Sequence, residues 1–144
     1  MTPAARASIQ VAVTAAGDRA PAGATLVGVG WATVELERAS RELGLAVTDA
    51  PDDLALGARC RSGMGDHGTP VILLEPSTEG RLAASLARLG EGPHVTWWDV
   101  DESGGTTLLG PLPGPLGPAR LVRDGRHDGR WLFLRERGAA TIRG

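Results

Sequence analysis

The chain has 144 residues, 42% of them hydrophobic, which is the size of one domain with one substantial core. The formal net charge of -2 and a pI near 5.9 lack the basic excess of a dedicated nucleic-acid-binding protein, so we expect no nucleic-acid partner. The fifteen Lys and Arg residues are all arginine, which excludes lysine-based Schiff-base chemistry.

Cysteine content and hydropathy indicate the compartment. Cys60 is the only cysteine, so neither an intrachain disulfide nor a cysteine-based zinc site can form. No apolar segment approaches the roughly 20 residues of a membrane span. Gln10 and Thr14 interrupt any apolar centre of a signal peptide in residues 1–16. We therefore expect a cytoplasmic protein without membrane contact.

Residues 1–24 precede the main domain, which we place at residues 25–144. Ile9, Val11 and Val13 alternate with Gln10 and other residues, as the side chains of an edge strand do. The same residues also suit a loosely held N-terminal arm. Both alternatives stay open.

Residues 26–36, LVGVGWATVEL, predict the first strand of the domain. Gly28, Gly30 and Ala32 share one face of this strand and leave space above the sheet. Glycines inside a strand favour close approach of another group. That group is either a neighbouring backbone or a bound ligand.

The following residues predict a helix, three strands and a second helix. Residues 37–43 form the first helix, and strands follow at 45–48, 54–61 and 71–74, with a turn at 49–53 and a hairpin loop at 62–70. After the string LLEP, Ser77 or Thr78 can cap a helix in which leucines recur at helical spacing. Residues 94–100 then form an extended, Trp- and Val-rich segment.

The last third of the chain departs from this pattern. Residues 101–118, DESGGTTLLGPLPGPLGP, contain too much Gly and Pro for a regular helix. Strands are expected at 119–123 and 130–137, with a turn at 124–129 and a closing strand at 139–144. The second half therefore reads as a reduced unit with an open edge, which favours pairing with a second copy in a homodimer.

The order of strand, LLEP, helix, G-E-G, His94 and aromatic strand resembles the vicinal oxygen chelate superfamily. Within it the likeness is to glyoxalase and bleomycin-resistance proteins, and most to methylmalonyl-CoA epimerase-like members. The resemblance implies an α+β fold in which βαβββ modules form a half-open barrel. Module one would span residues 26–76, the linker helix 77–91, and a reduced module two 93–144.

The resemblance also implies where a metal ion would be held, and this chain lacks those ligands. Gly28 stands where the first-strand histidine is expected, Ile72 where a Glu or Gln precedes LLEP, and Val95 where the second-module histidine lies. The final ligand is a glutamate on the closing strand, and no carboxylate follows Glu136. We therefore expect no metal and no other cofactor.

Apolar side chains would replace the metal ligands inside the barrel. We expect them to line a pocket for a flat hydrophobic or aromatic ligand, with the Trp97 indole as a stacking surface. The alternative is that they fill the barrel as core. The predicted ligand-binding residues are Gly28, Gly30, Ala32, Ile72, Leu74, Val95 and Trp97.

Two further side chains are candidate catalytic groups. Asp99 shares the Trp97 face and is the nearest carboxylate to the predicted pocket. His94 lies on the opposite face, so the two form no dyad, and a hydrogen-bonded turn histidine is the simpler interpretation. Glu75 of LLEP is expected to fix a strand–helix corner.

Three functions remain in competition. The first is a metal-independent small-molecule-binding protein that sequesters a hydrophobic or aromatic metabolite or antibiotic. The second is an epimerase, isomerase or cyclase-like enzyme of acyl-CoA or secondary metabolism that uses Asp99 or His94. The third is a non-catalytic structural subunit with a filled barrel.

Overall fold

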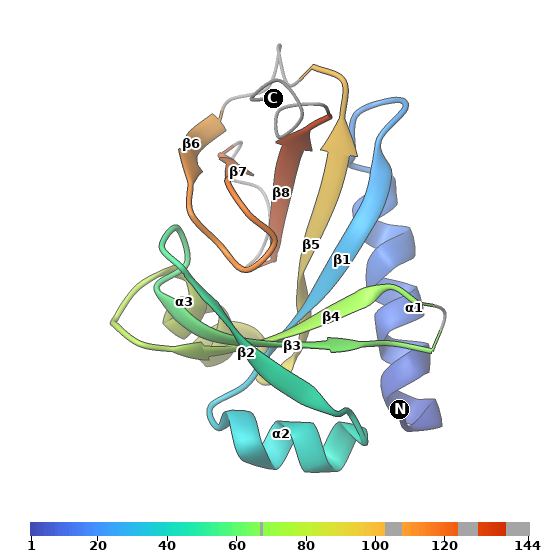
Figure 1. The fold of residues 1–144 in the computed structure, drawn as a ribbon, viewed down its shortest axis with the longest axis vertical. Coiled ribbons are helices and arrows are strands. Elements are labelled where there is room, and N and C mark those ends of the chain that lie inside the picture. The colour runs from blue at the N-terminus through green and yellow to red at the C-terminus, as the bar shows by residue number, and fades with distance from the viewer. Residues whose placement is uncertain (67, 103–107, 124–129, 138–144) are drawn as a thin grey trace.

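A computed structural model describes residues 1–66, 68–102, 108–123 and 130–137. The helices are α1 (Pro3–Gly17), α2 (Leu36–Leu43) and α3 (Arg81–Leu89). The strands are β1 (Thr25–Ala32), β2 (Val47–Asp53), β3 (Ala58–Met64), β4 (Pro70–Pro76), β5 (Gly92–Val100), β6 (Leu108–Leu112), β7 (Ala119–Val122) and β8 (Trp131–Glu136). Figure 1 shows how they curl around a common interior.

All these strands belong to one sheet with the order β2-β3-β4-β1-β5-β8-β7-β6. β1 and β5 pair antiparallel at its centre, and each pairs parallel with the last strand of its own half, β4 or β8. The two halves therefore repeat one strand order on either side of the β1–β5 seam. This is the α+β half-open barrel that the sequence predicted.

The second module keeps four strands, the number that the sequence predicted, but β6 was not among those expected. β6 lies within the Gly- and Pro-rich segment that we expected to be irregular. β8 pairs parallel with β5 and so closes the module, a role that we had assigned to residues 139–144. Residues 124–129 and 139–144 lie outside the described part of the chain. The described residues of segment 101–118 contain no helix, as its Gly and Pro content predicted.

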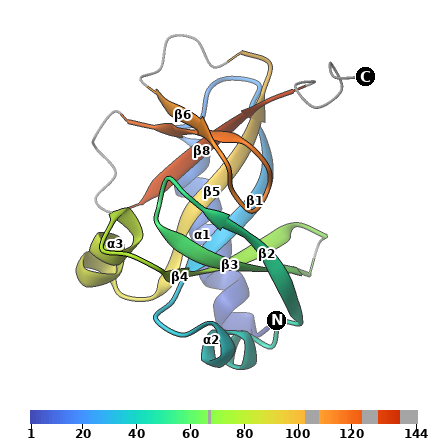
Figure 2. The same cartoon turned by 60° about the vertical axis from the view of Figure 1, so that its left-hand side comes forward.

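α1 replaces the arm or extra strand expected in residues 1–24. Thr2 caps the helix, because its Oγ1 accepts a hydrogen bond from the amide of Ala5 at 3.2 Å, and Pro3 suits the first turn. Side chains four residues apart share a face of a helix, so Ile9 and Val13 lie toward the sheet whereas Val11 is exposed. The alternation of these three residues was therefore misleading. Figures 1 and 2 show α1 running along the outer side of β1 and β5.

Several boundaries in module one also differ from the prediction, among them the end of β1, which lies at Ala32 and not at residue 36. β2 continues through the expected turn at residues 49–53, and the chain reverses at 54–57 instead. α3 begins after Gly80, which offers no side-chain cap, so neither Ser77 nor Thr78 caps it. The helical spacing of the leucines nevertheless placed α3 correctly, with Leu82 fully buried.

The core has an inner and an outer part. The inner cluster fills the barrel and includes Ile72, Trp97 and Phe133. One outer cluster lies under α2 and the start of α1, and another lies where the end of α1 packs on Trp98. In the part of the chain that is described, no helix combines the length and the apolar character needed to cross a membrane.

A proline interrupts each outermost strand of the sheet. Pro51 lies in β2, at an irregular point of the β2–β3 pairing, and Pro111 lies in β6. Proline removes a backbone donor, and such residues are typical of protected sheet edges. The open edge that we expected in module two is therefore protected, and so is the edge of module one.

Candidate functional site

The predicted ligand-binding residues come together inside the barrel and are buried there. A Cβ built on Gly30 would lie 2.6 Å from Leu74 Cδ1, 2.8 Å from Val95 Cβ and 2.9 Å from Trp97 Cζ3. The space that Gly30 leaves is therefore occupied by these neighbouring side chains. In this conformation the barrel interior is packed as core, which is the alternative to an open pocket.

Trp97 is the centre of this packing. Its indole is fully buried and stacks on Phe133, with ring centroids 5.4 Å apart and planes inclined by 7°. The indole N–H groups of two other tryptophans have acceptors: Trp98 donates to Thr96 Oγ1 and Trp131 to Ser85 Oγ. Trp97 Nε1 is buried and has no acceptor among the described residues. Such an orphaned donor in a core calls for a specific explanation.

A short segment between β6 and β7, residues 113–118, crosses the open side of the barrel; we call it the strap. Leu116 Cδ1 lies 2.7 Å from where a Cβ of Gly28 would stand. The strap is held by two hydrogen bonds to its neighbours: Leu54 N–H donates to Pro113 O at 3.2 Å, and Arg135 Nη1 donates to Leu116 O at 2.7 Å. Figure 1 shows this connection reaching the turn between β2 and β3.

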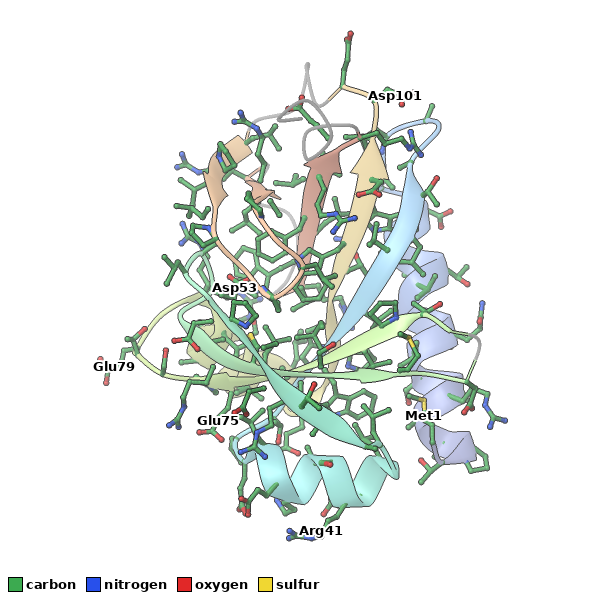
Figure 3. The ribbon with its side chains drawn as sticks, in the orientation of Figure 1. Met1, Arg41, Asp53, Glu75, Glu79 and Asp101 are labelled. Carbon is green, nitrogen blue, oxygen red and sulfur yellow. The ribbon has the colours of Figure 1, made fainter. Side chains whose placement is uncertain are left out.

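The strap also meets a buried acid. Asp53 is 2% exposed, and its Oδ1 accepts a hydrogen bond from the amide of Leu56 at 2.9 Å. Its Oδ2 lies 3.0 Å from where a Cβ of Gly114 would stand, so a side chain at Gly114 would require Asp53 to shift by a few tenths of an ångström. Burial raises the pKa of Asp53 to about 6. Figure 3 labels Asp53 at this junction.

The candidate catalytic residues lie apart from each other. Arg135 donates two hydrogen bonds to the carboxylate of Asp99, at 2.8 and 3.2 Å, so Asp99 forms a bidentate ion pair beside the strap. The ring Nε2 of His94 lies 2.7 Å from Gly90 O, at the turn before β5. Burial lowers the pKa of His94, although the Gly90 carbonyl acts in the opposite direction. His94 thus has the contact of a turn histidine.

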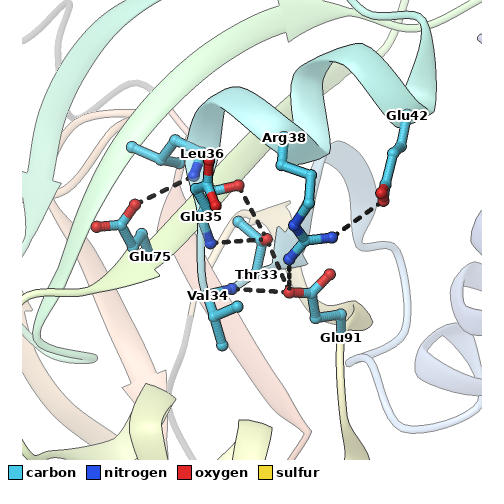
Figure 4. Close-up of polar contacts among 8 residues, drawn as sticks. All are labelled: Thr33, Val34, Glu35, Leu36, Arg38, Glu42, Glu75 and Glu91. Atoms are coloured by element: carbon cyan, nitrogen blue, oxygen red, sulfur yellow. Dashed lines mark hydrogen bonds and ion pairs between the residues drawn. The ribbon is translucent and has the colours of Figure 1, made fainter.

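The two acidic residues of the LLEP and G-E-G strings both anchor the junction of β1 and α2 (Figure 4). Glu75 Oε2 accepts a hydrogen bond from the amide of Leu36, at the start of α2, as the prediction of a strand–helix corner requires. Glu91 Oε2 accepts hydrogen bonds from Val34 N–H and from the buried Thr33 hydroxyl, and it pairs with Arg38. These acids therefore have structural partners on module one.

The closing strand of module two is β8 and not residues 139–144, so the expected position of the fourth metal ligand falls on β8. Its residues Phe133 and Arg135 contact Trp97 and Asp99 of β5. Glu136 is in register with Val100, whose side chain belongs to an outer cluster. Over the described ranges, no three His, Cys, Asp or Glu side chains form a set that could hold a metal ion.

Outside the barrel, the described residues form clefts that include the following two, neither of which the sequence predicted. The larger, of about 360 Å³, lies between β2, β3 and the start of α2, and its walls include the ion pairs Arg61–Asp49 and Arg59–Glu75. The smaller, of about 110 Å³, lies between α1 and the sheet. Both depend on contacts between distant segments, so local sequence patterns carry no signal for them.

Three arginines near the C-terminus, Arg120, Arg135 and Arg137, have partners within the chain. Arg120 donates to Gly110 O and lies 3.6 Å from Glu136, and Arg137 pairs with Asp101. Sequence reasoning missed the partners of Arg135, because they become apparent only when β5 and β8 are paired.

The chain matches no protein-family model, and comparison with curated proteins found no match. Solved structures do match. Methylmalonyl-CoA epimerase from Mycobacterium tuberculosis is 18% identical, with a TM-score of 0.63 over 83% of this chain and 91% of that one. A hypothetical protein from Bacillus halodurans is 19% identical, with a TM-score of 0.61 over 80% and 95%.

A variant of Streptomyces coelicolor methylmalonyl-CoA epimerase, in complex with 2-nitronate-propionyl-CoA, is 19% identical with a TM-score of 0.59 over 76% of this chain and 94% of that one. At these identities the likeness concerns the fold. The chain therefore has the glyoxalase-like α+β fold of the vicinal oxygen chelate type, which it shares with methylmalonyl-CoA epimerases.

Proposed function

We propose that this protein binds a small, flat, hydrophobic or aromatic molecule inside the barrel without a metal ion. The observation that carries the proposal is the orphaned Trp97 Nε1–H, a donor buried among apolar side chains. A ligand with an acceptor atom would satisfy this donor and remove the cost of leaving it unpaired. Stacking on the Trp97–Phe133 pair would orient the ligand's ring.

Access to this site requires the strap to move. Leu116 is the strap side chain that covers Gly28, and the hydrogen bonds from Leu54 and Arg135 hold the backbone around it. Displacement of Leu116 would open space beside Gly28 for a ligand. The Asp99–Arg135 pair would then lie next to that space. A bound molecule in this position would be enclosed and sequestered.

A reversible lock on the strap tests this proposal. Leu54→Cys together with Pro113→Cys places thiols at two residues joined by a backbone hydrogen bond of 3.2 Å. Cys60 does not compete, because burial and then the Asp53 carboxylate raise its pKa to about 12. Calorimetric titration with planar hydrophobic metabolites and acyl-CoA esters should show binding to the reduced variant. Binding should disappear on oxidation and return on reduction.

Trp97 provides the matched pair of variants. Trp97→Phe keeps an aromatic ring and loses the N–H group, so binding should weaken about fivefold, the value of one hydrogen bond of roughly 1 kcal/mol. Trp97→Ala also loses the stacking surface and should bind more weakly still. Equal affinity for the wild type and both variants would contradict the barrel site. Failure of every ligand to bind the folded, reduced protein would favour the packed structural barrel.

An acyl-CoA epimerase is the second candidate, supported by the fold of the methylmalonyl-CoA epimerases. This reaction needs a group that accepts a proton next to a carbonyl. Asp99, whose partner Arg135 donates to Leu116 O of the strap, is the carboxylate that we propose for this role. Its ion pair with Arg135 would have to open. Deuterium uptake from D2O at the carbon next to the thioester, lost in Asp99→Asn, would establish this function. Binding without uptake would favour sequestration.

We also propose a homodimer, for which protected sheet edges favour contact through a face of the sheet. Sedimentation velocity of the wild type measures this directly. A single species of one-chain mass over a hundredfold range of concentration would contradict the proposal.

A further inference from the structure

α1 rests unevenly on the outer face of the sheet. Of its fifteen residues, Ala5 and Ala16 near the two ends are buried. Between them, Ile9 and Val13 lie over the sheet but remain only half-buried. Small alanines let the ends of the helix approach the sheet closely, whereas the middle of the helix stands away from it. The result is a gap beneath the middle of α1.

This gap is the cleft of about 110 Å³, which we call the α1 cavity. Its floor is formed by Val29 and Val71, which are 1% and 2% exposed. An apolar cavity of roughly 150 Å³ in another protein stays dry and binds benzene or xenon, so a cavity near this size suits one small apolar group. The apolar residues around it are Met1, Ile9, Val13, Leu26, Val29 and Val71.

One end of the α1 cavity carries a polar pair. Arg6 of α1 and Asp66 of the loop after β3 both line it, and their side chains form an ion pair at 2.6 Å. Both side chains are partly exposed, 53% for Arg6 and 32% for Asp66. A ligand could therefore bury an apolar end under α1 while its polar end stays beside this pair and the solvent.

We infer that the α1 cavity is a binding site for a small amphipathic molecule with one aromatic ring or a short branched alkyl group. The helix acts as a cover, and the Arg6–Asp66 pair lies beside the polar end of the ligand. The site is separate from the barrel. Val29 and Val71 alternate along their strands with Gly28, Gly30 and Ile72, so the two sets face opposite sides of the sheet.

Toluene and xenon are suitable probes, because they test the apolar cavity without a polar group. Titration followed by methyl NMR should shift Ile9, Val13, Val29 and Val71 and saturate. Val13→Phe should fill the cavity and weaken toluene binding at least tenfold. Val11→Phe is the matched control on the same helix, because Val11 is 71% exposed, and it should bind toluene as the wild type does.

The outcomes separate this site from the barrel. The strap variant with Leu54→Cys and Pro113→Cys should bind toluene equally when oxidised and reduced. Loss of toluene binding on oxidation, or shifts confined to Val95 and Leu121, would overturn the inference. So would equal binding by Val13→Phe and Val11→Phe.

If Val13→Phe does not fold, Ile9→Ala decides instead, because it enlarges the cavity. It should acquire saturable binding of naphthalene with shifts at Val29 and Val71, and absence of that binding would overturn the inference.

Discussion

Glu91 holds together the residues that lead from β1 into α2. Its carboxylate accepts hydrogen bonds from the Val34 amide and the Thr33 hydroxyl and forms an ion pair with Arg38. Thr33 is fully buried. Partial burial acts to raise the pKa of Glu91, but these hydrogen bonds outweigh it and the pKa lies below its usual value. The carboxylate is therefore charged and bound at neutral pH.

Replacement of Glu91 by Ala should destabilise the fold by about 1–2 kcal/mol. It removes the acceptor of the Val34 amide and the partner of Arg38, and it leaves the Thr33 hydroxyl with Glu35 O, at 3.2 Å, as its acceptor. Glu42→Ala is the control: this residue also pairs with Arg38 but is 60% exposed, so its loss should cost less than about 0.5 kcal/mol. Urea denaturation of both variants provides the comparison. Equal losses would mean that the Glu91 contacts contribute no more than a surface ion pair.

Asp53 gives the fold a pH dependence of the opposite sign to most carboxylates. Its pKa rises from 3.8 to about 6 on folding, so the folded protein binds the proton more tightly than the unfolded chain. The stabilisation of the folded state that Asp53 contributes is complete below about pH 4 and is lost as the pH rises through about 6. It amounts to about 3 kcal/mol.

Asp53→Asn keeps an oxygen that can accept from Leu56 and removes the titration. Relative to the wild type, this variant should gain about 3 kcal/mol in free energy of unfolding between pH 4 and pH 7, measured by urea denaturation. Taking the difference between the two proteins cancels other groups, including Glu91, whose contribution runs the other way. A difference that does not change with pH would contradict the assignment.

Single residues were predictable from the sequence where a local string fixed their role. Glu75, at the end of β4, was correctly placed at a strand–helix corner. The burial of Trp97 followed from its place in an apolar strand. Leu116 and Arg135 were missed, because their contacts join segments that lie far apart in sequence. No local pattern encodes such contacts.

At the level of elements, α1 covers part of the outer face of β5. Ala16 is 3% exposed and packs in the same cluster as Trp98. α1 therefore supplies cover for module two from outside that module's own segment. The helix thus completes the fold from outside the two repeated modules.

Ala16→Glu should therefore destabilise the protein by about 2 kcal/mol or more, because it places a charge against the Trp98 indole. Val11→Glu on the exposed side of the same helix should change the stability by less than about 0.5 kcal/mol. Thermal unfolding of the two variants checks this. A similar midpoint for both would show that α1 is not firmly seated at its C-terminal end.

Elements were predictable where their hydrophobic period was clear. The period-2 pattern of β1 and the spacing of leucines in α3 located both elements, although β1 ends at Ala32 and not at residue 36 as predicted. For α1, the alternation over five residues suggested a strand. The better signal was Thr2 and Pro3 before an Ala-rich run, which is typical of a helix start. β6 was missed because Gly110 and Pro111 are unusual inside a strand, although an edge strand tolerates them.

At the level of the whole molecule, the antiparallel β1–β5 seam joins the two modules. Gly30 lies in this seam opposite Val95, and Trp97 packs over it. Gly30→Ala would bring a Cβ within 2.6–2.9 Å of three neighbouring side chains. We expect a loss of about 1–3 kcal/mol from overpacking.

Gly17→Ala is a matched control, because the added Cβ would meet only Trp98 Cη2, at 3.6 Å. This change should be neutral or slightly stabilising, since it reduces the freedom of the unfolded chain. Both variants should unfold in one transition, because the seam makes the modules one cooperative unit. Separate transitions for the two halves would contradict this.

The prolines in β2 and β6 have a consequence for how the protein behaves when many copies are present. Fibril growth by edge addition needs an uninterrupted row of backbone donors and acceptors on an outermost strand. Pro51 and Pro111 break that row at both ends of the sheet. Concentrated solutions should therefore stay free of amyloid. Replacing both prolines by valine should allow fibres that bind thioflavin to form.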